Sequence, residues 1–324
     1  MSVLSFSAPT ESSHSAPFYR RRRFQQNFYG WLFALPAILG LVCFSAGPVL
    51  ASFYFSLTDY SVVKPPSFVG LQNFVDLLTS DGLFRQSLWI TTYYSLLAIP
   101  LSLIIGLLIA ILLNQRVRGV AIYRAIWYLP TIVPIVATAT LWRWILNSEF
   151  GLVNWPLKTL GLPAPGWLTD PAWTIPSLVL IHLWAIGNAM LINLAGLQGV
   201  PVQLYEAASI DGATSWTKFW HVTIPMLSPV LFFNLVLGII ESFQVFTIVY
   251  VIFTPGGTSS GTAGPANAAL FYVLYLYRNA FEYFKMGYAS AMAWILFLII
   301  VALTWLAFRL QGRWVYYEGG KIGE

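Results

Sequence analysis

The sequence predicts an all-α membrane protein, a polytopic helical bundle with six transmembrane helices. Of its 324 residues, 58% are hydrophobic and only 9% are charged, whereas an average soluble domain has about 25% charged residues. Six apolar stretches are each long enough to cross a bilayer as a helix, which takes about 20 residues. Their apolar residues run continuously rather than alternating, which excludes the strands of a membrane β-barrel. The composition also excludes a nucleic-acid-binding protein and an ordinary soluble enzyme.

The six predicted spans account for nearly half of the chain. They are residues 31–57, 87–113, 122–146, 173–197, 227–253 and 288–310. Prolines within them, such as Pro100, Pro130 and Pro134, are tolerated in bilayer helices because neighbouring helices or hydroxyl side chains satisfy the freed carbonyl groups. The single cysteine, Cys43, lies in the first span, so no disulfide can form within the chain.

The positions of the 17 lysine and arginine residues predict that both termini are cytoplasmic, because cytoplasmic loops are enriched in these residues. The richer side would hold Arg20, Arg21, Arg22, Arg23, Arg116, Arg118, Arg124, Lys218, Arg309, Arg313 and Lys321. The other side would hold Lys64, Arg85, Lys158, Arg278 and Lys285. The arginine run 20–23 is expected to lie beside anionic membrane lipid.

This topology divides the chain into five parts. They are a cytoplasmic N-terminal tail 1–30, a flanking transmembrane helix 31–57, an outer loop 58–86, a five-helix core 87–310 with a cytoplasmic loop 198–226, and a cytoplasmic C-terminal tail 311–324. Prolines and glycines predict that the outer loop is ordered. Residues 269–284, rich in phenylalanine and tyrosine, predict a helix at the outer membrane interface, where such side chains prefer to lie.

The cytoplasmic loop 198–226 is the most informative segment. Its pattern predicts two short helices, because Gly212 can adopt the left-handed conformation that ends a helix and Thr214 is a suitable N-cap for the next. Three aromatic residues at helical spacing would form one apolar face that anchors the hairpin to the membrane helices: Trp216, Phe219 and Trp220. A helical hairpin tethered to two spans in this way is suited to dock against another protein.

The same loop carries a family resemblance. The run Glu206-Ala-Ala-x-x-Asp211-Gly212-Ala213, followed by Val222-x-Ile224-Pro225, resembles the EAA loop of permease subunits of binding-protein-dependent ABC importers. Segments 67–74, 128–130 and 287–291 resemble the carbohydrate branch of that family. Segment 68–74, Phe-Val-Gly-Leu-Gln-Asn-Phe, is more similar to the first of its two paired permeases, the maltose or glycerol phosphate permease type.

The resemblance implies a type I ABC importer permease in a prokaryotic inner membrane, not an enzyme. It implies a heterodimer with a second permease subunit, two ATPase subunits, and an extracytoplasmic solute-binding protein that delivers a carbohydrate. The residues that would couple to the ATPase are Glu206, Ala207, Ala208, Asp211, Gly212 and Ala213. ATP and Mg would be bound by the ATPase, and no cofactor is expected in this chain, whose sequence lacks a phosphate-binding Gly-x-x-x-x-Gly-Lys-Ser/Thr motif. For Glu206 taken alone, a solvated surface acid remains the alternative.

Polar residues within the fourth and fifth spans predict a substrate path. A carboxylate at mid-membrane, such as that of Glu241, costs about 2.5–3.5 kcal/mol on insertion scales and is expected to face a partner or a water-filled cavity. Gln244, Ser242 and Asn188 lie at similar depth, and such groups can hydrogen-bond the hydroxyls of a sugar. The alternative is hydrogen bonding between helices, which is common in membrane bundles. His182 is expected to be a helix-contact residue.

The sequence therefore predicts a permease that imports a carbohydrate by alternating access. Two alternatives remain open at this point. A polytopic membrane enzyme acting on lipid-linked sugar would require clustered acids or a metal motif, and a secondary transporter would require paired repeats and more intramembrane ionisable groups than Glu241. The motifs are shared by importers of many sugars, so they predict a carbohydrate without naming one.

Overall fold

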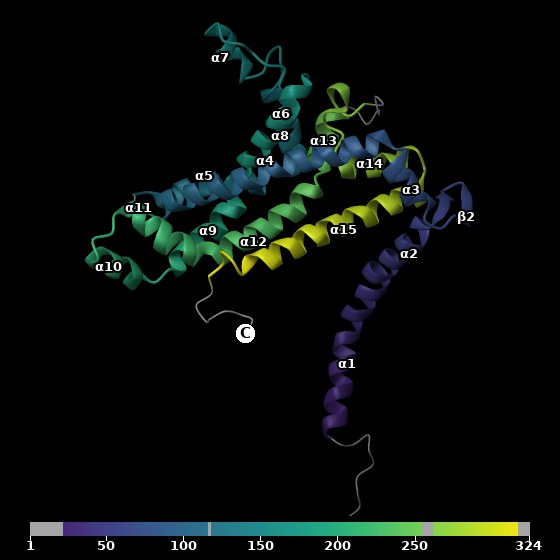
Figure 1. Cartoon of the computed structure of the whole chain (residues 1–324), viewed down its shortest axis with the longest axis horizontal. Coiled ribbons are helices and arrows are strands. Elements are labelled where there is room, and N and C mark those ends of the chain that lie inside the picture. Colours follow the sequence, from purple (N-terminus) through teal and green to yellow (C-terminus); the bar gives the residue numbers. More distant parts are fainter. Residues whose placement is uncertain (1–21, 116–117, 255–261, 317–324) are drawn as a thin grey trace, which may run out of the picture. The chain divides into compact units, whose positions relative to one another are not determined.

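The structure, a computed structural model, describes residues 22–115, 118–254 and 262–316 (Figure 1). The chain divides between Tyr54 and Phe55 into two units. The first unit contains α1 (Arg22–Leu41), a π-helical turn η2 (Val42–Ala46) and most of α2 (Gly47–Ser56). The helix begins at Arg22, within the predicted tail 1–30, and the boundary between tail and span stays a prediction. The part of that tail before Arg22 lies outside the described residues.

The second unit begins with a small β-hairpin, which the all-α prediction missed. Strands β1 (Thr58–Ser61) and β2 (Lys64–Phe68) pair antiparallel. Two consecutive prolines in β2 had suggested a loop, but prolines are compatible with an edge strand. The hairpin is followed by α3 (Gln72–Thr79), from which Asn73 donates hydrogen bonds of 2.9 Å to the carbonyl oxygens of Ser56 and Thr58. The predicted outer loop 58–86 is thus ordered, and it ends earlier, at the start of the next helix.

That next helix, α4 (Gly82–Leu113), is the central element of the second unit. It packs against α8, α9, α12 and α14. Pro100 lies inside α4 without ending it. Helix α12 (Ile224–Phe243) packs against α4, and α15 (Met286–Gln311) packs against α12. The core forms two clusters, one around Phe84 and Tyr272 and the other around Met190 and Leu227.

Two of the predicted spans are bent pairs of helices. The bounds are α5 (Val120–Ile132) and α6 (Ile135–Ile145), and α8 (Pro171–Trp184) and α9 (Gly187–Gly199). The bends are 100° and 50°. The described chain has four helices long and apolar enough to cross a membrane, and six if each bent pair is one span. The predicted number of spans agrees with that upper count.

Residues 122–146 and 227–253 are each predicted as one span, and like 173–197 each of them is interrupted in the structure. In the first, Val133 is extended and Pro134 precedes α6, because a residue before proline disfavours the helical conformation. In the second, α12 ends at Phe243 and α13 (Thr247–Phe253) begins only after residues 244–246.

The segment expected at the outer membrane interface is buried around Tyr272 and exposed at Phe281, Tyr283 and Phe284. It forms α14 (Tyr272–Tyr277) and a π-helical turn η6 (Arg278–Glu282), preceded by a short 3-10 turn η5 (Pro265–Asn267). Tyr272 is fully buried, its N–H donates to Thr91 Oγ1 over 2.9 Å, and its hydroxyl donates to the Met292 carbonyl oxygen over 2.8 Å. The first part of the segment thus belongs to the protein core, and its location at the membrane interface stays a prediction.

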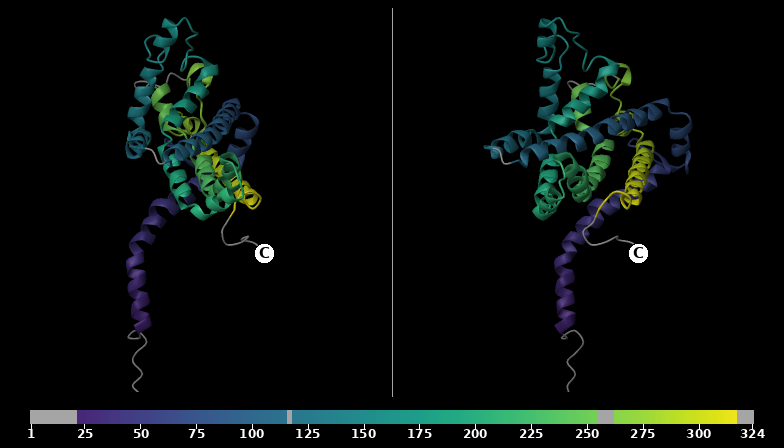
Figure 2. Two further views of the ribbon diagram at one scale, coloured as in Figure 1. Left: turned by 90° about the vertical axis from the view of Figure 1, so that its left-hand side faces the viewer. Right: turned by 60° about the vertical axis from the view of Figure 1, so that its left-hand side comes forward.

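Three short helices complete the second unit. They are α7 (Asn154–Thr159), α10 (Val202–Ile210) and α11 (Ser215–Lys218), the last continued by the π-helical turn η3 (Phe219–Thr223). In both views of Figure 2, α6 and α7 extend away from α4, α12 and α15. Helices α10 and α11 lie at one end of the second unit, and the β-hairpin lies at the other (Figure 1).

Candidate functional site

A cavity of about 390 Å³ lies where the helices of the second unit break. Its wall includes Val133 and Ile135 from the α5–α6 bend, Ala185 from the α8–α9 bend, and Val245 and Phe246 from the α12–α13 break. Breaks free backbone groups from their own helix, and such groups are tolerated at membrane depth only inside protein or beside a water-filled cavity. The breaks therefore identify a polar position within an otherwise apolar bundle.

The four residues predicted to line a substrate path all lie on the wall of this cavity. They are Asn188 of α9, Glu241 and Ser242 of α12, and Gln244 of the following break. Asn188, Glu241 and Gln244 are exposed. Ser242 is buried, and its hydroxyl donates a hydrogen bond of 3.3 Å to the Ile239 carbonyl oxygen. The structure thus brings the four together, and their binding of substrate stays a prediction.

A smaller cavity of about 110 Å³ adjoins the first, because the two share Asn188, Glu241, Ser242 and His182. Asn234 also lines it. The Asn234 side-chain amide donates a hydrogen bond of 2.9 Å to Asn193 Oδ1, and both residues are buried. This amide bridge ties α12 to α9 beside the cavity.

Sequence reasoning missed Tyr94, which contacts His182. Tyr94 of α4 is 3% exposed, and its ring meets the His182 ring edge-on at a centroid distance of 6.2 Å. Both residues line the larger cavity, and His182 lines the smaller one as well. The ring contact agrees with the prediction that His182 is a helix-contact residue, and His182 also borders the cavities. A tyrosine in an apolar span carries no local signal, whereas the prolines at 130 and 134 were the available hint of a break.

The loop 198–226 folds as the predicted helical hairpin. Gly212 has a φ of 77°, the left-handed conformation that favours glycine. The Ala213 N–H donates to the Ala208 carbonyl oxygen over 2.9 Å, which closes α10 with a Schellman motif. Thr214 caps α11 through its side-chain oxygen, as predicted.

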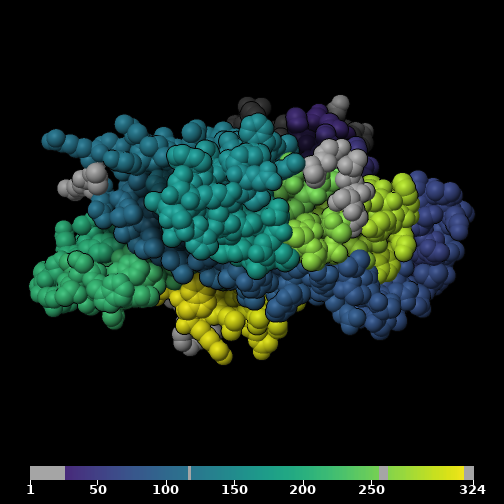
Figure 3. Space-filling view, turned by 90° about the horizontal axis from the view of Figure 1, so that it is seen from above, coloured from purple at the N-terminus to yellow at the C-terminus, as the bar shows by residue number. Residues whose placement is uncertain are grey.

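Two side-chain contacts fix the shape of this hairpin. Lys218 Nζ donates to Ser209 Oγ over 2.6 Å, which ties α11 to α10. The hydroxyls of Tyr205 and Thr223 are 3.0 Å apart and join α10 to the turn before α12. In the space-filling view, α10 and α11 form a green lobe at one end of the second unit (Figure 3). The hairpin is therefore a prearranged surface connected directly to α12.

The residues predicted to couple to an ATPase lie mostly on the surface of this lobe. Glu206, Ala207, Asp211 and Gly212 are exposed, and Ala208 and Ala213 are half-buried. The predicted aromatic anchor is only partly correct. Phe219 packs against the cluster around Leu227, whereas Trp216 and Trp220 stay exposed, the former at 70%.

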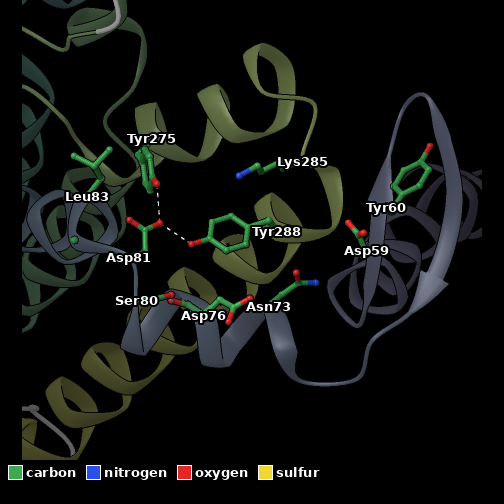
Figure 4. Close-up of a pocket in the computed structure, with 11 residues that line it drawn as sticks. Asp59, Tyr60, Asn73, Asp76, Ser80, Asp81, Leu83, Tyr275, Lys285 and Tyr288 are labelled. Carbon is green, nitrogen blue, oxygen red and sulfur yellow. Dashed lines mark hydrogen bonds between the residues drawn. The ribbon is translucent and has the colours of Figure 1, made fainter.

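A polar pocket of about 700 Å³ opens near the β-hairpin (Figure 4). Its Asp81 carboxylate accepts hydrogen bonds from the hydroxyls of Tyr275 and Tyr288, over 2.7 and 2.6 Å, and from the Phe84 backbone N–H. Asp81 thereby joins the start of α4 to α14 and α15. Burial raises the pKa of this carboxyl, but the hydrogen bonds outweigh burial and lower its pKa below the ordinary value. Sequence reasoning missed this contact, which joins residues far apart in the chain.

Comparison with known proteins gives consistent results. Residues 98–316 match the family described as binding-protein-dependent transport system inner membrane component. The chain is 40% identical over 296 residues to the probable ABC transporter permease protein YesP of Bacillus subtilis, covering 91% of this chain and 94% of that protein. It is 33% identical over 284 residues to the trehalose/maltose transport system permease protein MalF of Thermococcus litoralis, covering 87% and 93%.

A solved structure shares the fold. A chain of the bacterial alginate ABC transporter, crystallised in complex with an alginate pentasaccharide-bound periplasmic protein, superposes with a TM-score of 0.79 at 22% identity, covering 91% of this chain and 98% of that chain. These findings exclude the alternatives of a membrane enzyme and of a secondary transporter, because the matched family consists of components of binding-protein-dependent systems. The chain belongs to the family of inner membrane components of binding-protein-dependent transport systems, as a multi-pass ABC transporter permease.

Proposed function

We propose that this chain is the permease subunit of an ATP-driven carbohydrate importer and forms half of its translocation path. The observation that carries the proposal is the cavity at the helix breaks, where Asn188, Glu241 and Gln244 present exposed amide and carboxylate groups. Such groups donate and accept the hydrogen bonds that sugar hydroxyls require. A relative named for trehalose and maltose transport supports a carbohydrate cargo.

The position of the cavity supports alternating access. It lies within the bundle, between the end that holds α10 and α11 and the end that holds the β-hairpin (Figure 1). In a membrane these ends face opposite sides, with both termini of the chain on the cytoplasmic side. Cargo released by an extracytoplasmic solute-binding protein enters from the β-hairpin end, reaches the cavity and leaves toward the cytoplasm.

The energy for this cycle comes from other subunits. The exposed residues of the coupling hairpin, with Glu206 at their centre, dock on one of two ATPase subunits that bind ATP and Mg. A second permease subunit supplies the other half of the path. The Schellman motif and the Lys218–Ser209 contact support this role, because a coupling element must keep its shape under force in both directions.

The test uses the complete complex purified through a tag on this chain. Recovery of an ATPase and a second permease, together with sugar uptake into proteoliposomes that requires ATP and loaded binding protein, is the expected result. Glu241→Ala should reduce uptake at least tenfold while the complex still assembles and hydrolyses ATP. Glu149→Ala, at an exposed acid outside the cavity, is the control and should leave uptake unchanged. Normal uptake by Glu241→Ala would reject Glu241 as a path residue, and uptake by the lone chain without ATP would reject the importer.

A further inference from the structure

Glu241 is a carboxylate without a counterion on the walls of the two adjoining cavities. It lines both of them. Within the described ranges, its carboxylate takes part in no hydrogen bond and no salt bridge, and the lining residues include no lysine and no arginine. The charge therefore faces the cavity rather than a partner on this chain.

Two of the neighbouring hydroxyls donate their hydrogen bonds elsewhere. The Ser242 hydroxyl donates to the Ile239 carbonyl oxygen, and the Thr131 hydroxyl donates to the Tyr128 carbonyl oxygen over 2.6 Å. Both hydroxyl protons are therefore donated within their own helices and not to Glu241. The His182 ring packs edge-on against Tyr94.

A carboxylate in this position acts on whatever enters the cavity. Several lining residues are apolar, including Pro130, Leu178 and Ile181, and apolar walls strengthen electrostatic interactions relative to bulk water. Hydroxyl and ammonium groups donate hydrogen bonds to a carboxylate, whereas a second anion is repelled. The cavity is thus suited to cargo that brings donors and no negative charge.

We propose that Glu241 makes the path selective for charge, favouring neutral and amino-substituted sugars over carboxylated and phosphorylated ones. The proposal rests on the proposed function and adds the class of substrate to it. The fold does not decide this property, because a similar fold belongs to an importer of the acidic polysaccharide alginate. The side chain at position 241 decides the charge selectivity.

The experiment measures charge selectivity without the solute-binding protein. Cys43 is the single cysteine of the chain, so Cys43→Ser with Asn188→Cys places one reporter thiol on the wall of both cavities. The purified complex is treated with a trimethylammonium or a sulfonate methanethiosulfonate of similar size. The increase in mass of this chain over time gives the rate at which each reagent modifies the reporter thiol. Each rate is divided by the rate of the same reagent with a free thiol in solution, which corrects for intrinsic reactivity.

With Glu241 present, the corrected ratio of cationic to anionic rates should be about tenfold. Glu241→Gln should bring the ratio close to one, and Glu149→Gln should leave it at the original value. Equal ratios with glutamate and glutamine at position 241, or no reaction with either reagent, would overturn the proposal. Failure of the proposed function would give a different result. The ratio of rates would still change with Glu241→Gln, but modification of the reporter thiol would leave sugar uptake unaffected.

Discussion

Glu206 is an exposed acid on α10, in a hairpin whose shape is set by contacts that do not involve it. Its effect on stability of the isolated chain should therefore be small, and its effect on subunit docking large. A charge-assisted hydrogen bond contributes about 1.5–3 kcal/mol, and a reversed charge in a protected contact is repulsive. Glu206→Lys should abolish the stimulation of ATP hydrolysis by loaded binding protein and lower the recovery of ATPase.

The measurement compares ATPase stoichiometry and stimulation in purified complexes with the amount of permease in the membrane. Glu149→Lys, which reverses an exposed acid far from α10 in the chain, is the matched control. Full stoichiometry and full stimulation with Glu206→Lys would assign Glu206 to the solvated surface and remove it from the coupling residues.

Asp81 predicts a dependence of stability on pH. Its pKa is lowered in the folded protein, so the carboxylate contributes stability above its ordinary pKa of 3.8, and this contribution is lost as the pH falls through the folded value. Asp81→Ala leaves the hydroxyls of Tyr275 and Tyr288 without their acceptor and should cost about 1–3 kcal/mol at neutral pH.

Thermal unfolding of the detergent-solubilised complex at neutral pH and at acidic pH measures this contribution. The melting temperatures of the wild type and Asp81→Ala should differ at neutral pH and converge under acid. A difference that stays constant or grows as the pH falls would mean that the ionised carboxylate is not the stabilising form.

At the scale of elements, the packing of α9 against α5 maintains the cavity wall. A Cβ atom added at Gly187 would lie 2.8 Å from the Trp127 carbonyl oxygen and 3.0 Å from the Tyr128 Cα. Overpacking of this kind typically costs about 1–3 kcal/mol. Gly187→Ala should therefore lower the melting temperature and impair uptake.

Gly199→Ala is the control at the other end of the same helix, where an added Cβ meets nothing within 4 Å. It should be neutral or slightly stabilising, because alanine favours the helix. If both variants have the melting temperature of the wild type, α5 can shift away from α9 without loss of stability. The close approach at Gly187 would then be unimportant.

Prolines show why the element boundaries were harder to predict than the number of spans. Pro100 and Pro134 both lie in long apolar runs, but α4 continues through the first, while the chain bends before the second. Local sequence is similar at the two positions. The difference arises from tertiary packing, because α4 contacts other helices along its length, whereas the α5–α6 bend opens on a cavity.

At the scale of the whole molecule, the uneven distribution of lysine and arginine predicts the orientation. Both termini should be cytoplasmic, so a protease added to intact spheroplasts should spare a C-terminal tag and cleave it after permeabilisation. The β-hairpin provides the internal control, since a protease site inserted between Ser61 and Lys64, at its turn, should be cut in intact spheroplasts. Cleavage of the C-terminal tag while the membrane is sealed would overturn the topology.

The sequence predicted the two functional regions to different depths. The shape of the hairpin formed by α10 and α11 could be predicted from local sequence. Gly212 was expected to be left-handed and Thr214 to cap the second helix, and both predictions are confirmed. Glu241 was identifiable because a charge at mid-membrane requires an explanation. Tyr94 and Asp81 were not, since their roles depend on partners distant in the chain, His182 for one and Tyr275 and Tyr288 for the other.

The sharp bend between α5 and α6 has a consequence for how the chain enters the membrane. These helices have 13 and 11 residues, which at a rise of 1.5 Å correspond to about 20 and about 17 Å. Each is shorter than a hydrocarbon layer of about 30 Å, and at 100° to one another they cannot both follow the bilayer normal. A pair bent in this way enters the lipid as a broken span or a re-entrant loop rather than as a straight rod. The part of the cavity wall that it forms is therefore supported by packing on α9, as at Gly187, rather than by a continuous helix.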